Sequence, residues 1–449
     1  MRNSSLRPLA RALLALSIAA TAARAADDAD LTALRAQIKA LEKKLLVLER
    51  KQELQDERVA ITDRGATLSS ADGANSLRLR GLVQLYARQF FHDAGITNNA
   101  FVLRRARLIY EGTLAKSYSF QLVSEFGGAS PSILDANIGW TLSPTLQFKL
   151  GRFKSPVGLE LLQSDAWTFF NERSIVTNLV PNRDLGVQAS GDLLGGKLNY
   201  TVALLGGVAD GASSTNSDFD NEKDVAGRLW ATPFKDDVNS PLQGLSFGLS
   251  GSYGREKGAS GRTAGYRTDG QQVFYSYLAT TITDGPSWRL SPQFDFRRGP
   301  FGLQGEYVVS AVNVRAAAGA KLTELRNKAW QVSAGYVVTG ESSSNAGVVP
   351  ARNFNFTDGT WGAFEIVGRF ASLEVDDDAF PLYASPAASV AAASSVGFGL
   401  NWYLSKAVRF TFDYYQTNFD RAPGAPAVST NPVTRQDENS LITRFQLSF

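Results

Sequence analysis

The chain has no cysteine, one methionine and one histidine among its 449 residues. Without cysteine it forms no disulfide, as suits an exported bacterial protein that folds without them. The single histidine, His92, stands beside Asp93 in a predicted loop, where a solvated role is favoured over activation of a nucleophile. The sequence shows no glycine-rich phosphate loop with lysine and no cluster of histidine or cysteine ligands. It therefore predicts a protein that is not an enzyme and uses no cofactor or metal.

The chain also lacks a strong excess of charge of either sign. It has 46 basic and 43 acidic residues, a formal net charge of +3. Four arginines lie in the first 25 residues, which we expect to be removed, and without them 42 basic residues stand against 43 acidic ones. A general basic surface for nucleic acid is excluded, so any preference for anions depends on where the charges point.

Long apolar runs are absent too. From residue 76 onward no run is long enough for a transmembrane helix. Residues 1–25 read as a secretory signal, with Arg2 and Arg7 at the positive end, an apolar run over 9–20 and Ala-Arg-Ala at 23–25. The alternative is a membrane anchor, but the apolar run is short for a bilayer. The sequence predicts cleavage before Ala26.

Residues 26–62 carry a heptad seam and are predicted to form a short periplasmic coiled coil. Spacings of three and four keep one stripe facing a partner helix. A solitary amphipathic helix is the alternative, and the regular seam favours oligomerisation, with a trimer expected. A linker is predicted over 63–75. The seam consists of Leu31, Leu34, Ile38, Leu41, Leu45 and Leu48.

From residue 76 to 449, segments of about ten residues alternate apolar with polar, as in 77–85 and 408–414. A strand has period two, so each segment presents one apolar and one polar face, which lipid outside and water inside require. Short turns follow some segments and long polar loops follow others, the outer-membrane pattern. The predicted fold is all-β, a transmembrane antiparallel β-barrel preceded by the coiled-coil helix.

About seventeen candidate runs are present, whereas a barrel with both ends in the periplasm needs an even number. We assign the run at 271–282 to an external loop, which leaves sixteen strands. The alternatives are a soluble sandwich or an adhesin passenger, but a passenger would show internal repeats and none is visible. The last strand favours the barrel, because its apolar face ends in the terminal phenylalanine. That face consists of Leu441, Phe445, Leu447 and Phe449.

Period-two alternation also predicts which charged residues face the lumen, and among these the basic residues outnumber the acidic ones two to one. The alternative is a balanced lumen in which these charges pair for stability. The predicted basic residues of the wall are Arg78, Arg80, Arg88, Arg105, Arg107, Lys149, Arg228, Arg289, Arg369 and Arg409. The predicted acidic residues are Glu125, Asp295, Glu306, Glu365 and Asp413.

The connection 152–184 follows the predicted fifth strand and would be the third external loop. It combines eight charged residues with Phe153, Trp167, Phe169 and Phe170. Aromatic content argues against full exposure, so we expect the loop to fold inward and narrow the pore. Lysine or arginine there would replace part of an anion's hydration and repel cations. The alternative is a surface loop with solvated charges.

Several stretches resemble the phosphate-selective porins of the O and P type, a likeness that covers most of 76–449. They are Leu150-Gly151-Arg152-Phe153-Lys154-Ser155-Pro156-Val157-Gly158-Leu159-Glu160, Asn171-Glu172-Arg173-Ser174, Thr339-Gly340-Glu341, Trp361-Gly362-Ala363-Phe364-Glu365, Asn401-Trp402-Tyr403-Leu404 and the terminal Arg-Phe-Gln-Leu-Ser-Phe.

The resemblance implies a sixteen-stranded homotrimer in the lipid of the outer membrane of a Gram-negative bacterium, passing small anions, phosphate or pyrophosphate above all. Residues 223–232 offer one arginine, not the dense run of a dedicated phosphate ladder. A general anion porin and a structural or surface-interaction barrel are therefore the alternatives. The solute-binding residues that the resemblance implies are Arg152, Lys154, Arg173 and Arg183 at the constriction, with Arg105, Arg107, Arg78 and Arg80 along the wall.

Overall fold

The computed structural model describes residues 35–47, 58–63, 65–91, 99–216, 220–260, 263, 265–426 and 437–449. The chain divides into two compact units, one of residues 1–58 and 69–72, the other of residues 59–68 and 73–449. The predicted signal segment 1–25 lies outside the described residues. No helix in the described ranges is long and apolar enough to cross a membrane, a finding that does not bear on strands.

In the first unit, residues 35–47 form an α-helix. It contains three residues of the predicted heptad seam, Ile38, Leu41 and Leu45. Leu41 is 57% exposed and Leu45 48% exposed in the single chain. The parts of the predicted coiled coil at 26–34 and 48–57 lie outside the described residues.

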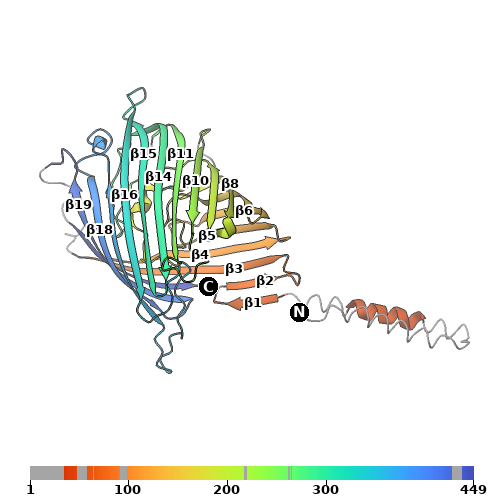
Figure 1. Ribbon diagram of the computed structural model, residues 1–449. Helices are drawn as coiled ribbons and strands as arrows, with labels where there is room; N and C mark the ends of the chain where they lie inside the picture. The colour runs from red at the N-terminus through yellow and green to blue at the C-terminus, as the bar shows by residue number, and fades with distance from the viewer. Residues whose placement is uncertain are drawn as a thin grey trace, which may run out of the picture. The chain divides into compact units, whose positions relative to one another are not determined.

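The second unit contains the barrel, in which sixteen strands pair antiparallel (Figure 1). The strands are β3 (Ser76–Phe91), β4 (Ala100–Leu114), β5 (Tyr118–Glu125), β6 (Ser132–Ser143), β7 (Leu146–Lys154), β8 (Arg183–Leu193), β9 (Leu198–Leu205), β10 (Asp224–Ala231), β11 (Leu245–Ser260), β14 (Ile282–Arg298), β15 (Phe301–Arg315), β16 (Thr323–Val337), β17 (Ala363–Glu374), β18 (Val390–Tyr403), β19 (Val408–Arg421) and β20 (Glu438–Ser448).

The sheet closes between its first and last strands. β20 pairs with β3 in the register Phe445↔Leu85, and the Gly81 amide donates to the carbonyl oxygen of Phe449 at 2.7 Å. A closed sheet has no edge, which leaves no strand backbone unpaired in lipid. The predicted sixteen-stranded barrel is confirmed.

The run at 271–282, which we assigned to an external loop, lies in the loop before β14 and contains one strand of a small hairpin. Only its last residue, Ile282, belongs to β14. That hairpin pairs β12 (Tyr266–Arg267) with β13 (Val273–Tyr275), outside the barrel sheet. Two more strands, β1 (Arg58–Thr62) and β2 (Gly65–Ser69), pair with each other, and β2 pairs with β3. They occupy the predicted end of the coiled coil and part of the predicted linker, where Val59 and Ile61 alternate with period two.

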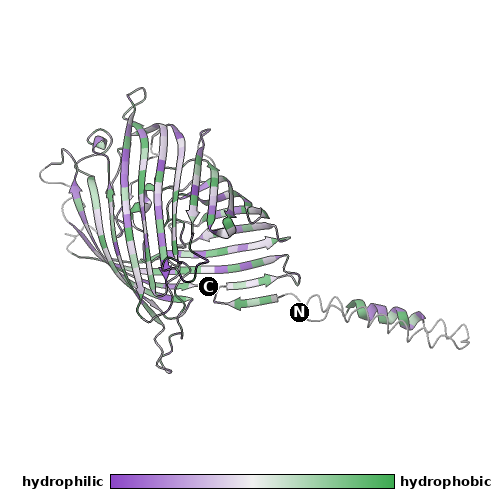
Figure 2. Cartoon of the chain, viewed as in Figure 1, coloured by the Kyte–Doolittle hydropathy of each residue, from purple (hydrophilic) through white to green (hydrophobic). Residues whose placement is uncertain are grey.

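The two faces of the wall differ as period two requires. On β16, Trp330 and Tyr336 are 42% and 47% exposed, whereas Gln331 and Ser333 are each 1% exposed. The same alternation of hydrophobic and hydrophilic residues runs along the neighbouring strands (Figure 2). Large apolar side chains therefore cover the outside, and polar ones point inward.

The wall is lower on one side. Strands β5 to β10 have 8 to 12 residues, whereas β11, β14, β15 and β16 have 15 to 17. Short turns join strands at the end where β3 begins and β20 ends, with longer connections at 232–244 and 338–362. Long loops lie at the other end, and one of them, residues 155–182 between β7 and β8, positions the candidate site.

Candidate functional site

Residues 155–182, named here the inner loop, lie inside the barrel. The Leu159 amide donates to Glu306 of β15 at 2.7 Å, and the Asn171 amide donates to Asp413 of β19 at 2.6 Å. On the wall strand β3, the Gln84 side-chain amide donates to the carbonyl oxygen of Asp165 at 3.0 Å. Contacts with three separate wall strands place the loop across the lumen instead of on the surface.

Asp165 of the inner loop is a hub for arginines. Its carboxylate lies 3.2 Å from Arg105 and 2.6 Å from Arg173, and it also pairs with Arg107. Burial by itself would raise the pKa of Asp165, but Arg105, Arg173 and Arg107 outweigh it and hold that pKa well below its usual range. Asp165 therefore stays ionised and neutralises part of the arginine charge.

Glu172 is a second hub on the same loop. Arg104 lies 2.6 Å from its carboxylate, Arg88 3.4 Å and Arg105 3.7 Å. Burial opposes ionisation of Glu172, but the charge of Arg104 and then of Arg105 lowers its pKa to about 2. The two carboxylates together fix the loop to the β3–β4 wall.

Arg104 and Arg105 both reach this loop although they are neighbours in one strand. The β3–β4 register shifts between Gln84↔Arg105 and Leu85↔Leu103, so Arg104 is the extra residue of a β-bulge. A bulge lets two successive side chains turn to the same face. Strict alternation predicts only Arg105 and Arg107 inward, and Arg104 was missed for that reason.

Three arginines on β17, β19 and β20, the strands that continue the wall from β3, bind the main chain of the inner loop. Arg409 donates to the carbonyl oxygens of Thr168 and Phe169 at 3.0 Å. Arg444 donates to Asn171 at 3.3 Å, and Arg369 donates to Glu172 at 3.1 Å. These guanidinium groups satisfy loop carbonyls, so their hydrogen-bonding capacity is largely used within the protein.

Beside the inner loop lies a cavity of about 370 Å³, named here the lumen cavity. Its lining comes from β4, from the short strands β5 to β10, from Leu82 of β3 and from the loop. Five basic side chains line it, Arg107, Lys149, Lys154, Arg183 and Arg228, against two acidic ones, Asp135 and Asp165. The other lining residues are Leu82, Ile109, Gln121, Val123, Phe153, Pro156, Leu162, Ser164, Gln188 and Thr201.

Both acidic residues of the lumen cavity form ion pairs with arginine. Asp135 receives Arg183 at 3.1 Å, and Asp165 receives the three arginines described above. In contrast, Lys149, Lys154 and Arg228 have no carboxylate oxygen within 4 Å among the described residues. Lys154 donates to the carbonyl oxygens of Leu161 and Gln163 at 2.7 and 2.8 Å. The cavity therefore carries a local excess of positive charge.

The two other cations lie against aromatic rings. The Lys149 ammonium is 5.7 Å from the ring centre of Phe153, and the Arg228 guanidinium is 4.2 Å from that of Trp230. Arg228 also donates to Gln293 at 3.3 Å. Ring contacts hold a cation in place without neutralising it, so the charge stays available to a solute.

The structure separates the eight residues predicted to bind solute. Lys154, Arg107 and Arg183 line the lumen cavity, whereas Arg105 and Arg173 lie in the ion-pair network of Asp165. Arg78 and Arg80 pair with Glu111 at 3.3 and 3.0 Å near the turn end of the barrel. Arg152 donates to the carbonyl oxygen of Ile133 at 2.8 Å and lies outside the cavity lining.

Seven of the ten basic wall residues predicted to face inward have a carboxylate partner. Paired charges are what the alternative of a balanced lumen describes, and they account for most of the wall. The exceptions are Arg409, which binds loop carbonyls, and Lys149 and Arg228 of the lumen cavity.

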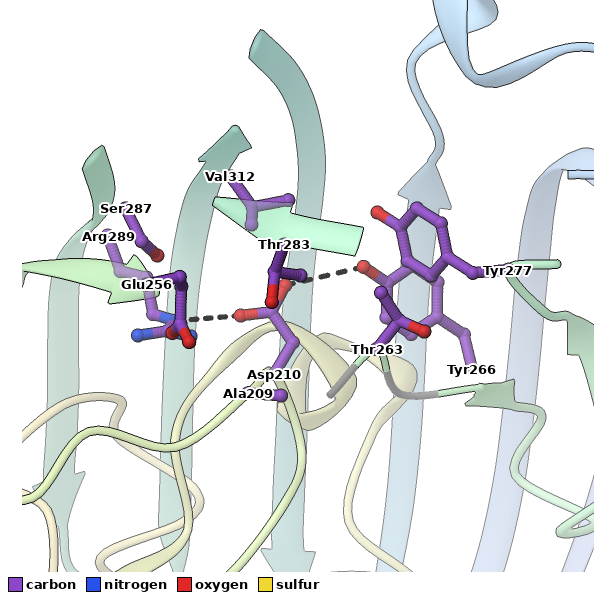
Figure 3. A pocket seen from close by; sticks show the side chains of 10 residues that line it. All are labelled: Ala209, Asp210, Glu256, Thr263, Tyr266, Tyr277, Thr283, Ser287, Arg289 and Val312. Atoms are coloured by element: carbon purple, nitrogen blue, oxygen red, sulfur yellow. Dashed lines mark hydrogen bonds and ion pairs between the residues drawn. The ribbon is translucent and has the colours of Figure 1, made fainter. Parts of the chain in front are cut away.

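A second hollow, of about 20 Å³, lies where loop 206–223 meets β14 (Figure 3). There Asp210 accepts from Arg289 at 2.7 Å and from the Tyr266 hydroxyl at 3.3 Å. The volume suffices for about one water molecule. No group of three or more histidine, cysteine, aspartate or glutamate side chains within the described ranges could hold a metal ion. The lumen cavity is thus the larger of these two candidate solute sites.

Comparison with known proteins agrees with this architecture. Porin O of Pseudomonas aeruginosa is 24% identical over 428 residues, covering 87% of this chain and 92% of that protein. The outer membrane channel DcaP of Acinetobacter baumannii superposes with a TM-score of 0.53 at 12% identity, covering 85% of this chain and 99% of that one. The trimer form of OmpT of Vibrio cholerae gives 0.52 at 10% identity, with 84% and 100% covered.

Porin O is a porin and DcaP is an outer membrane channel, which confirms the predictions of a channel instead of an enzyme and of an outer-membrane location in a Gram-negative bacterium. The family profile of the phosphate-selective porins O and P matches residues 78–449, most of the chain. The closed sixteen-stranded barrel, its inner loop and this match lead to one conclusion: the chain is an outer-membrane porin and belongs to the phosphate-selective porin O and P family.

Proposed function

We propose that this porin passes anions by passive diffusion, with phosphate or pyrophosphate as solutes, through the lumen cavity beside the inner loop. The observation that carries the proposal is the local charge excess of Lys149, Lys154 and Arg228. Both acidic groups of the cavity already have arginine partners, so these three cations face the solute without competition from a carboxylate.

The chemistry of the three groups suits an oxyanion. Ammonium and guanidinium donors make short, charge-assisted hydrogen bonds that replace part of the hydration of an entering anion. The same groups repel cations. Arginine and lysine differ in geometry, because Arg228 offers a planar fork and the lysines offer point charges. A solute bound by all three would exchange water for several donors at once.

Lys154 is the residue on which we would test solute binding. In a planar bilayer, phosphate added at constant KCl is expected to reduce the single-channel chloride current, and Lys154→Met is expected to raise the half-blocking concentration about tenfold. Lys197→Met is the matched control, since Lys197 is 40% exposed and pairs with Asp236 in the turn region.

Two other outcomes would contradict either phosphate selectivity or the role of Lys154. Anion-selective current without a phosphate block would make the protein a general anion porin. A phosphate block that Lys154→Met leaves unchanged would overturn the assignment of the site to Lys154.

We further propose a homotrimer, with residues 1–25 as a signal peptide and the part of 26–62 that precedes β1 as a periplasmic coiled coil. Residues 63–75, which include β2, then form the connection to the barrel of 76–449. The exposed Leu41 and Leu45 of the helix at 35–47 support a partner for that helix. The trimer form of the Vibrio OmpT, which shares the fold, supports three subunits. Cross-linking of the detergent-solubilised protein is expected to yield a three-subunit species, and a purely monomeric species would contradict the proposal.

A further inference from the structure

Three aliphatic side chains line the lumen cavity on adjacent wall strands. They are Leu82 of β3, Ile109 of β4 and Val123 of β5, and Ile109 and Val123 are direct cross-strand partners. Inward aliphatic side chains occur elsewhere on the wall too, such as Val308, Leu325 and Leu373, but those pack in the largest apolar cluster together with inner-loop residues. Leu82, Ile109 and Val123 instead form an aliphatic strip that faces the lumen cavity.

Two residues of this strip do not pack in an apolar cluster. Leu82 and Val123 are 4% and 5% exposed, yet they join none of the three apolar clusters of buried described residues. Phe153, by contrast, lines the cavity and also packs in the largest cluster. Leu82 and Val123 thus give the cavity an apolar surface that no such cluster of the protein covers.

Cations stand directly beside this strip. Arg107 is the cross-strand partner of Leu82, and it lies two residues from Ile109 on the same face of β4. On the other side of the cavity, the Lys149 ammonium lies 5.7 Å from the ring centre of Phe153. Pro156 and Leu162 of the inner loop add further apolar surface. The cavity therefore combines apolar walls with a small number of cationic groups.

A hydrated inorganic anion gains nothing from aliphatic walls, because it has no apolar surface to bury. An anion with an apolar body gains in proportion to the apolar area that it removes from water. Apolar walls with a few placed polar groups, in a volume of about 300–1,000 Å³, are typical of sites for small organic molecules. The lumen cavity, at about 370 Å³, falls in that range.

We propose that the lumen cavity binds organic anions, in which one carboxylate or phosphate head is joined to an apolar body about the size of an aromatic ring. The head lies on Lys149, Lys154 and Arg228, and the body lies against Leu82, Ile109 and Val123. This proposal rests on the proposed anion conduction and names the class of solute that the same site prefers.

The test compares anions that share a head and differ in the body. Benzoate against acetate, and phenyl phosphate against inorganic phosphate, are added to the full-length protein in a planar bilayer at constant KCl. The aromatic member of each pair is expected to block chloride current at a concentration at least about tenfold lower, the gain from burying one ring.

Val123→Thr changes the chemistry of the strip with little change of shape. It is expected to reduce the ratio between the acetate and benzoate half-blocking concentrations severalfold. Val202→Thr is the control, because Val202 is 52% exposed on β9 next to the cavity residue Thr201, and it should keep the wild-type ratio.

Equal block by both members of each pair in the wild-type protein would overturn the proposal, whether or not the variant folds. The zero-current potential in a KCl gradient separates this failure from that of the proposed function. Anion selectivity with equal block removes only the organic-anion preference, whereas cation selectivity removes anion conduction itself.

Discussion

At the residue scale, the lumen is organised by a few buried carboxylates, each shared among several cations. Asp165 and Glu172 together bind five arginines, and both lie on the inner loop. Two carboxylates neutralise only part of the charge of five arginines, but they hold these arginines in contacts within the protein. The cations left for a solute are those that these two carboxylates do not hold, above all Lys149 and Lys154.

Asp165→Asn is predicted to destabilise the folded barrel, because it leaves Arg105, Arg107 and Arg173 buried with less counter-charge. Breaking such a buried pair typically costs about 3–5 kcal/mol. The temperature at which the folded form is lost on gel electrophoresis should fall accordingly. Glu111→Gln is the control, since its partners Arg78 and Arg80 are 38% and 36% exposed and such pairs contribute at most about 1 kcal/mol. Equal effects of the two substitutions would contradict the role of Asp165.

Glu172 predicts how stability changes with pH. Its pKa is lowered from 4.5 to about 2 in the folded protein, so its contribution is present above about pH 4.5 and is lost as the pH falls toward 2. The difference corresponds to roughly 3 kcal/mol. In urea unfolding in lipid vesicles, the part of the stability that Glu172 contributes should stay constant from pH 7 to 5 and decline below. Glu172→Gln should flatten that decline, and an unchanged slope in the variant would contradict the account.

At the element scale, alternation predicted the strands and most inward residues, but not the positions where a strand departs from period two. Arg105 and Arg107 follow the alternation of β4, and both lie inside. Arg104 faces the same way because of the bulge opposite Gln84, and nothing in the local sequence indicates that bulge. Which loop residues meet which wall residues could not be predicted either, because such partners are set by tertiary contacts.

The attachment of the inner loop to β15 gives a prediction at this scale. Glu306 accepts hydrogen bonds from the amides of Leu159 and Glu160 at 2.7 and 3.1 Å. Glu306→Leu leaves two buried amides unsatisfied, at about 1–3 kcal/mol each. The loop should loosen, and the open-channel current noise in a bilayer should increase. Tyr307→Phe, on the outer face of the same strand, should leave the noise unchanged; increased noise there as well would contradict a specific role for Glu306.

At the scale of the whole molecule, closure, strand number and location followed from patterns that span the chain: alternating segments, alternating connections and an apolar last strand. Which inward charges are paired, and which line the lumen cavity without a carboxylate partner, could not be predicted from these patterns, because this depends on tertiary contacts. The resemblance placed Arg152 at the constriction, and the structure places it outside the lumen cavity. Lys149 and Arg228 were predicted only as wall residues, and the structure places both in the lining of the lumen cavity.

The measurement that tests the central claim most directly is the zero-current potential of the purified porin in a KCl gradient. The account predicts anion selectivity in the wild-type protein. It also predicts that combining Lys149→Gln, Lys154→Gln and Arg228→Gln strongly reduces that selectivity, because the remaining charges of the cavity are paired. Cation selectivity of the wild-type protein, or anion selectivity that the triple variant retains in full, would contradict the claim that these three residues make the pore an anion channel.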